Sequence, residues 1–217
     1  MSLRHVLYWA QDEKLIPSNP IARIPMARVR RIARPVLSVE EEEKLLAGAS
    51  PHLHDLIIAA VDTGMRRKEL LTQRWEHVDL VRSVLTVTRS KTPEGEAREI
   101  PLTTRLKKLL EEHPEKSDLV FTYKGVAILG LKSAWNTAQV RAKLKRHFQF
   151  RDLRHCFASR LMEAGVIADV RKAIMGHEDG RNVHEGYIHV ELPAKREAIT
   201  KLERWVESQK SKLQLAS

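Results

Sequence analysis

Residues 63–70 of the chain read TGMRRKEL and join two predicted helices. Upstream, apolar residues recur at helical spacing and predict a helix over about residues 52–63, which Gly64 should end. Arg66 begins a further helix, expected over residues 66–75, directly after the glycine turn. Glu69 follows three residues later on the same helical face, where its carboxylate can hold the Arg66 guanidinium.

More helices are predicted on both sides of this stretch. Ser38 and Glu41 form a capping-box pattern, which predicts a helix that runs to about Gly48. Apolar periodicity predicts the others, at about residues 2–16, 103–112, 129–144, 151–164, 168–175 and 192–209.

One hairpin supplies the only convincing sheet. Residues 84–88 alternate as a strand, residues 93–95 form a Pro-Glu-Gly turn and residues 97–101 return. Residues 78–80 are a candidate third strand. The expected fold class is therefore mainly α with a small antiparallel β-sheet (α+β).

The N-terminal part of the chain has a different composition. Two prolines within residues 17–20 should end the first helix. This basic linker, residues 21–36, is either a strap over a phosphate backbone or a solvated connection. It has no acidic residue and carries five arginines, namely Arg23, Arg28, Arg30, Arg31 and Arg34.

The charge balance points to a polyanionic partner. The chain has 38 lysines and arginines against 28 acidic residues, a formal net charge of +10 and a pI near 9.9. Such a clustered excess on a small domain favours nucleic acid as the partner. A merely soluble basic surface is the alternative.

The remaining totals indicate a cytoplasmic protein without a membrane partner. The 217 residues, 42% of them hydrophobic, are enough for one large domain core. No apolar run approaches the roughly 18 residues that span a bilayer, and no signal peptide opens the chain. The single cysteine, Cys156, rules out an internal disulfide framework and suits a reducing compartment.

Several cations and one tyrosine lie at the ends of predicted elements. Arg154 opens the helix at 151–164, Lys91 lies at the lip of the hairpin, and His177 follows a helix end. Tyr187 comes ten residues after His177 in a polar stretch with a glycine beside it, which argues against a buried structural ring. Taken singly, each of these cations is most often a solvated surface charge.

Together, residues of these types can perform phosphoryl transfer. Two arginines can bind the nonbridging oxygens of a phosphodiester and neutralise the charge that grows in a pentacoordinate transition state. A lysine can protonate a leaving 5′ oxygen, a histidine can donate to the phosphate, and a tyrosine hydroxyl can attack phosphorus. The sequence has no Cys/His or carboxylate cluster of metal-ligand spacing, so we expect no metal and no cofactor.

The ordered motifs resemble the catalytic domain of the tyrosine recombinases, the phage integrase family. The resemblance covers about residues 37–190. It rests on TGMR-x-x-EL at 63–70, Lys91 in a hairpin, Asp152-Leu153-Arg154-His155, Gly176-His177 and Tyr187-Ile188-His189-Val190.

This resemblance implies a role for each matching residue. Arg66 and Arg154 would bind the scissile phosphate, and Lys91 would be the general acid for the 5′ leaving group. His177 would support the phosphate and the transition state. Tyr187 would be the nucleophile that forms a 3′-phosphotyrosyl link to DNA.

Two departures from the family pattern concern the catalytic base and the tyrosine loop. Arg151 occupies the position, three residues before Arg154, where the family usually has a histidine. Arginine cannot take the tyrosine proton, although it can donate hydrogen bonds and lower the pKa of a phenol electrostatically. The base would then be water, the substrate, His155 or His184. The spacing from His177 to the tyrosine is about one residue longer than usual.

The resemblance also implies a domain division. Residues 1–20 would be the last helix of a truncated core-binding domain, residues 21–36 the linker and residues 37–191 the catalytic domain. Residues 192–217 would form a C-terminal helix and tail that is exchanged between protomers, with packing in cis as the alternative.

The expected function is site-specific DNA recombination on double-stranded DNA by a homotetramer, in a nucleoid-associated prokaryotic or phage protein. The present chain alone can be monomeric. One alternative is a non-catalytic DNA-binding module on the same fold, which Arg151 favours. Another is a topoisomerase-like strand-relaxing enzyme, which shares the chemistry and differs in assembly.

Overall fold

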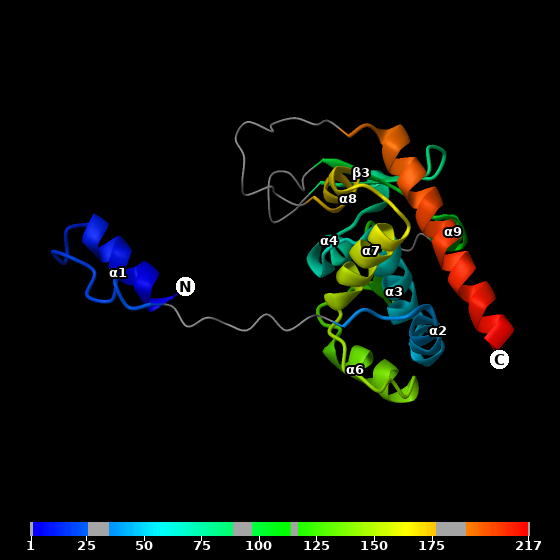
Figure 1. Ribbon diagram of the computed structural model, residues 1–217, viewed down its shortest axis with the longest axis horizontal. Helices are drawn as coiled ribbons and strands as arrows, with labels where there is room; N and C mark the ends of the chain where they lie inside the picture. Colours follow the sequence, from blue (N-terminus) through cyan, green and yellow to red (C-terminus); the bar gives the residue numbers. More distant parts are fainter. Residues whose placement is uncertain (1, 26–34, 89–96, 114–116, 177–189, 217) are drawn as a thin grey trace. The chain divides into compact units, whose positions relative to one another are not determined.

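The computed structural model describes residues 2–25, 35–88, 97–113, 117–176 and 190–216 (Figure 1). Lys91, His177 and Tyr187 lie outside these ranges. The chain divides into two compact units, Met1–Ala33 and Arg34–Ser217, which are described separately.

The first unit contains helix α1, Leu3–Asp12. This helix ends earlier than the predicted residue 16, because Lys14 adopts a left-handed conformation with φ of 59°. The amide of Leu15 then donates to the Ala10 carbonyl at 2.8 Å, which closes the helix end.

The segment after α1 folds back onto it. Asn19 is buried, and its backbone N–H donates to Gln11 Oε1 at 2.9 Å. Arg4 donates to the carbonyl of Ile21 at 3.1 Å. Ile21 lies in the sequence range assigned to the linker, so the described beginning of that range is bonded to α1. The proposed division into helix, linker and catalytic domain stays a prediction.

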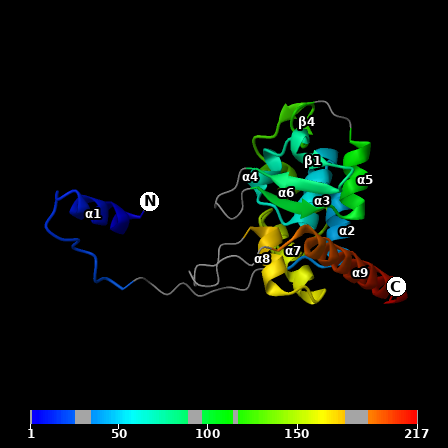
Figure 2. The same cartoon turned by 90° about the horizontal axis from the view of Figure 1, so that it is seen from above.

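The second unit is mainly helical and carries two small antiparallel sheets, which confirms the expected fold class (Figures 1 and 2). Its helices are α2 (Val39–Gly48), α3 (Pro51–Thr63), α4 (Arg67–Leu71), the 3-10 turn η1 (Trp75–His77), α5 (Thr104–Glu112), α6 (Lys132–Arg141), α7 (Asp152–Glu163), α8 (Ala168–Met175) and α9 (Leu192–Ala216). Its strands are β1 (Val78–Asp79), β2 (Val84–Val87), β3 (Arg98–Pro101), β4 (Thr122–Tyr123) and β5 (Val126–Ala127).

Local sequence signals account for most of these elements. The predicted capping box begins α2: Glu41 N donates to Ser38 Oγ at 3.1 Å, and Ser38 N donates to Glu41 Oε2 at 3.0 Å. The three predicted strands also form one sheet in the order β1-β2-β3, with Val84 opposite Pro101 and Val87 opposite Arg98.

Two expectations were wrong. The helix predicted over residues 66–75 ends at Leu71, because residues 73–75 pair with residues 118–120 instead, through bonds such as Val120 N to the Gln73 carbonyl at 2.9 Å. The predicted hairpin is also not the only sheet. Strands β4 and β5 pair around a turn in which Lys124 and Gly125 both have positive φ, 53° and 77°.

Helix α3 is the centre of the second unit. All of its residues from Leu56 to Thr63 are buried. It packs against α7, and also contacts α2, α4 and α5. A helix enclosed on these sides cannot shift without opening the core, so its C-terminal end is a fixed point on which a site can be built.

Helix α9 runs past the predicted end at residue 209. It packs against α2, α7, α8 and β3 of its own chain, and it buries Ala198, Ile199 and Leu202 (Figure 1). This is the cis arrangement; exchange of the helix between protomers concerns an assembly and stays a prediction. None of the described helices is long and apolar enough to span a membrane.

Candidate active site

The site begins at the C-terminal end of α3, where Gly64 caps the helix. Its φ is +62°, a left-handed conformation that glycine adopts without strain. A Cβ atom at this position would also lie 2.3 Å from Phe157 Cδ1 on α7. Position 64 therefore requires glycine for two independent reasons, and the turn that it makes brings Arg66 to the start of α4.

Glu69 holds Arg66, as the sequence predicts. Arg66 Nη1 donates to Glu69 Oε1 at 2.8 Å, and Arg66 N donates to Glu69 Oε2 at 2.9 Å. The Glu69 side chain is 2% exposed, whereas that of Arg66 is 26% exposed. The carboxylate therefore lies inside the domain, and the guanidinium extends from it toward the surface.

A second arginine, Arg98 of β3, binds the same carboxylate. Arg98 Nη2 lies 2.6 Å from Glu69 Oε2, and the Arg98 side chain is 3% exposed. Sequence reasoning missed this residue. The available signal was strand alternation, since Arg98 and Ile100 share the inward face of β3 and a buried arginine requires an anionic partner.

The two arginines keep Glu69 ionised. Burial by itself raises the pKa of a carboxyl group, and here it is the largest single influence. The hydrogen bonds and positive charges of Arg98 and Arg66 outweigh burial and lower the pKa of Glu69 to about 2.

Arg154 approaches the same place from the first turn of α7. Its Nη1 donates to the Gly64 carbonyl at 2.6 Å, and its Nη2 donates to the Met175 carbonyl at 2.6 Å. Burial, followed by repulsion from Arg66 and Arg98, lowers the pKa of Arg154 to about 10. The guanidinium stays charged at neutral pH, and the repulsion shows that positive charge is in excess among the described residues of the cluster.

The three guanidiniums converge on the end of α8. The consecutive carbonyls of residues 174–176 accept from Arg98 Nε at 3.1 Å, Arg154 Nη2 at 2.6 Å and Arg66 Nη2 at 3.3 Å, in that order. A helix C-terminus carries partial negative charge, so cations are stabilised there. We call Arg66, Arg98, Arg154 and Glu69 the arginine cluster.

Of the predicted site residues, the structure brings Arg66 and Arg154 together. Arg151 lies at the N-cap position of α7 and is exposed. Lys91, His177 and Tyr187 fall outside the described residues, so their predicted positions in the site stay predictions. Among the described residues, no group of three or more His, Cys, Asp or Glu side chains is placed to hold a metal ion.

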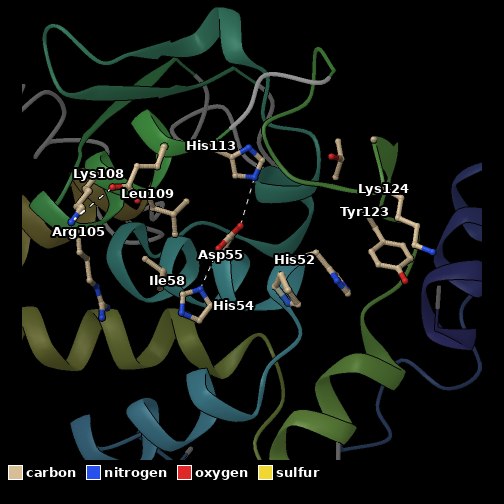
Figure 3. Close-up of a pocket in the computed structure, with 14 residues that line it drawn as sticks. His52, His54, Asp55, Ile58, Arg105, Lys108, Leu109, His113, Tyr123 and Lys124 are labelled. Atoms are coloured by element: carbon tan, nitrogen blue, oxygen red, sulfur yellow. Dashed lines mark hydrogen bonds and ion pairs between the residues drawn. The ribbon is translucent and has the colours of Figure 1, made fainter.

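A separate pocket of about 890 Å³ lies at the other end of α3 (Figure 3). Asp55 lies between two histidines there, with His54 Nδ1 at 3.2 Å from Oδ1 and His113 Nε2 at 3.6 Å from Oδ2. The arginine cluster does not line this pocket. We take the cluster as the candidate active site, because it brings together three partly or fully buried cations with one carboxylate and contains both arginines that the sequence predicts.

A mainly helical domain in which three arginines gather at a helix end beside a three-stranded sheet has groups that can bind a phosphodiester. The chain belongs to the phage integrase family, whose model matches residues 35–192. This range agrees closely with the resemblance over residues 37–190.

Known proteins support this membership. The chain is 28% identical over 199 residues to the Shufflon-specific DNA recombinase of Escherichia coli, covering 87% of this chain and 50% of that protein. It is 28% identical over 198 residues to the integrase of Salmonella phage P22, with 83% and 49% covered. A solved lambda integrase tetramer bound to a Holliday junction shares the fold, with a TM-score of 0.63 and 20% identity over 83% of this chain and 58% of that one. The chain spans about half the length of the two curated relatives.

Proposed function

We propose that this chain is the catalytic part of a site-specific DNA recombinase that cuts and rejoins DNA strands through a 3′-phosphotyrosyl intermediate. The observation that carries the proposal is the meeting of Arg66 and Arg154 at the end of α8. These two residues, 88 positions apart in the sequence, are the pair to which the family resemblance gives the scissile phosphate.

The reaction divides among a nucleophile, an acid and a phosphate-binding pair. The Tyr187 hydroxyl oxygen attacks phosphorus, the bond to the 5′ oxygen breaks, and Lys91 gives its proton to that leaving oxygen. Arg66 and Arg154 neutralise the second negative charge that the phosphate gains in the transition state. The ester to tyrosine conserves the bond energy, so a new 5′ hydroxyl can reverse the attack and reseal the strand. His177 supports the phosphate.

Arg151 acts as a phosphate ligand and not as the base. An arginine side chain offers donors and no acceptor, so the tyrosine proton passes to water, to the substrate or to a histidine. Arg151 is exposed and lies three residues before Arg154, at the N-cap of α7. From that position it binds a DNA phosphate beside the scissile one.

The segment that leads into α7 supports double-stranded DNA as the partner. Residues 141–151 contain five lysines and arginines and no acidic residue. Lys143 and Arg151 are exposed, and Arg146, also exposed, forms an ion pair with Glu41 at 3.2 Å. Exposed cations beside a phosphate site extend the positively charged surface that can bind the phosphates of a DNA duplex.

We propose that the active recombinase acts as four copies on two duplexes, in the nucleoid of a prokaryotic cell. The lambda integrase relative is described as a tetramer bound to a Holliday junction, and the fold is shared. The present chain covers about half of its curated relatives, so by itself it makes fewer DNA contacts and can be monomeric.

Trapping the covalent intermediate tests the proposal without knowledge of the target site. The chain is incubated with a pool of randomised duplexes that carry one nick, so that a cut strand diffuses away and the enzyme stays attached. Protein-bound DNA that survives denaturation is recovered and sequenced. We expect a recurring sequence, attached through Tyr187.

Tyr187→Phe is the control, and it should bind the recovered DNA equally and trap none. An unmodified chain that binds DNA and forms no adduct would support the rival function, a non-catalytic DNA-binding module, which Arg151 in place of a histidine favours. Relaxation of a supercoiled plasmid without strand exchange by the full-length protein would indicate a topoisomerase-like enzyme.

A further inference from the structure

Arg98 is a buried cation that the family resemblance does not assign. Its side chain is 3% exposed, and it joins β3 to two other parts of the site. Nη2 binds Glu69 Oε2 at 2.6 Å, and Nε donates to the Ile174 carbonyl at 3.1 Å. A side chain buried to this degree cannot itself contact DNA at the surface, so no direct catalytic role is available to Arg98.

We propose that Arg98 is a positioning residue that holds Glu69 and the end of α8 in place and offsets the charge of Glu69, so that Arg66 and Arg154 stay oriented and keep their full positive charge for the reacting phosphate. This inference rests on the proposed function. It concerns how the arginine cluster is held and charged, which the family assignment leaves open.

The first supporting observation is the net charge of the cluster. The cluster contains three guanidiniums and one carboxylate, of which Arg66 and Arg98 bind that carboxylate, so it has two positive charges in excess. A phosphodiester carries one negative charge, and the pentacoordinate transition state carries two. With Arg98, the two excess positive charges of the cluster balance the two negative charges of the transition state. Without Arg98, the one remaining excess charge balances only the ground state. Catalysis depends on this difference.

The second supporting observation is the position of Arg98 between Glu69 and the end of α8. Arg98 holds the Ile174 carbonyl, and the next two carbonyls hold Arg154 and Arg66. The planar guanidinium of Arg98 therefore fixes both the carboxylate that orients Arg66 and the helix end that orients Arg154. A lysine has one compact ammonium group and cannot hold both partners in this fixed arrangement.

A purely structural ion pair is the competing explanation, and Arg160 provides a matched control for it. The Arg160 side chain is 2% exposed, binds Glu42, and donates to the Leu37 carbonyl at 3.1 Å. It therefore has the same kinds of partner as Arg98. It lies on α7 with Arg154, but no member of the arginine cluster is among its partners.

The experiment measures the single-turnover rate of adduct formation at saturating concentrations of the DNA recovered with Tyr187. Arg98→Lys and Arg98→Met are compared with Arg160→Lys and Arg160→Met, alongside DNA affinity and thermal stability. We expect the Arg98 variants to lose about tenfold or more in rate, while their DNA affinity changes about threefold or less. The Arg160 variants should lose stability and keep their rate within about twofold.

A double variant separates charge from packing. In Arg98→Met, no guanidinium on β3 offsets the charge of Glu69. Adding Glu69→Gln removes that negative charge and restores the net charge of the cluster. Arg98→Met/Glu69→Gln should therefore react at least about fivefold faster than Arg98→Met. A structural role predicts the reverse, because the second change removes another partner.

Each failure has a distinct meaning. An active parent chain whose Arg98→Lys variant reacts at the parental rate overturns this inference alone, as does an equal loss of rate in the Arg98 and Arg160 variants. A double variant slower than Arg98→Met overturns the charge argument. A parent chain that forms no adduct overturns the proposed function and this inference with it. Arg98→Lys and the double variant keep the test decisive if Arg98→Met does not fold.

Discussion

The guanidinium of Arg154 meets the carbonyl of Gly64 at 2.6 Å. This bond links the start of α7 to the end of α3, and it depends on a carbonyl whose direction is set by the left-handed conformation of Gly64. The position of Arg154, which we propose binds the scissile phosphate, therefore depends on the backbone conformation of a residue 90 positions earlier.

Gly64→Ala should destabilise the domain and impair the site together. A left-handed alanine costs about 1 kcal/mol, and displacement of Phe157, whose Cδ1 atom would lie 2.3 Å from the new Cβ, adds about 1–3 kcal/mol. We therefore expect the free energy of unfolding to fall by about 2–4 kcal/mol. Urea denaturation measures this loss, and the trapping assay measures the loss of adduct.

Gly125→Ala is the matched control for backbone strain. Gly125 also has a positive φ, +77°, and apart from its chain neighbours no atom of the described residues lies within 4 Å of a Cβ built there. Its substitution should cost only the left-handed strain of about 1 kcal/mol and leave adduct formation unchanged. Equal losses at the two positions would contradict the role given to the Phe157 contact.

The arginine cluster shows which contacts a sequence can reveal. The Arg66–Glu69 pair follows from three-residue spacing on one helix, because neighbours on a helix face must meet. The Arg98–Glu69 pair joins a strand to a helix 29 positions apart. Alternation predicts that Arg98 points inward, but the identity of its partner depends on how β3 packs, which no local pattern encodes.

The secondary structure shows the same difference between features set by local sequence and features set by tertiary contacts. Capping and periodicity predict α2, α3, α5, α7 and α8 closely, because those signals are local. The early end of α4 at Leu71 arises from pairing between residues 73–75 and 118–120, a tertiary contact that replaces helical bonds. The β4–β5 hairpin was missed because two-residue strands are too short to show alternation.

Glu42→Gln should be strongly destabilising. Glu42 has a 3% exposed side chain and binds both Arg160 and Arg105, the latter at 2.7 Å. Removing its charge leaves Arg160 buried without a carboxylate, which should lower the free energy of unfolding by about 3–5 kcal/mol. Urea denaturation at neutral pH is the measurement.

Glu40→Gln is the control for Glu42→Gln. Glu40 lies two residues away and forms an exposed pair with Lys44 at 2.5 Å. Because solvent screens that pair, the variant should unfold at the same urea concentration as the parent. A comparable loss of stability at both positions would show that burial does not set the strength of these pairs.

Arg151→Gln tests the phosphate contact proposed for the N-terminus of α7. Loss of one phosphate ligand should weaken binding uniformly across DNA sequences and reduce the slope of log K against log salt by about 0.9. Fluorescence anisotropy over a salt series measures both quantities. An unchanged slope would remove Arg151 from the DNA interface.

Glu69→Gln should change how stability depends on pH. The folded-state pKa of Glu69 is about 2, below its ordinary value of 4.5, so the ionised group stabilises the fold. That contribution, about 3 kcal/mol, is complete above pH of about 4.5 and is lost as pH falls toward about 2. The difference in unfolding free energy between parent and variant should therefore be constant near neutrality and shrink in acid. A difference that grew as the pH fell would contradict this assignment.

Inorganic phosphate should stabilise the protein through the arginine cluster. Burial, followed by repulsion from Arg66 and Arg98, lowers the pKa of Arg154, and an anion bound among these groups would relieve the repulsion. Thermal unfolding in phosphate, against chloride at equal ionic strength, should show a rise of about 2 °C or more that Arg154→Gln abolishes. Arg141→Gln, which removes an exposed arginine at the end of α6, should keep the full rise. An equal rise in both variants would place the phosphate elsewhere and leave the cluster without its expected ligand.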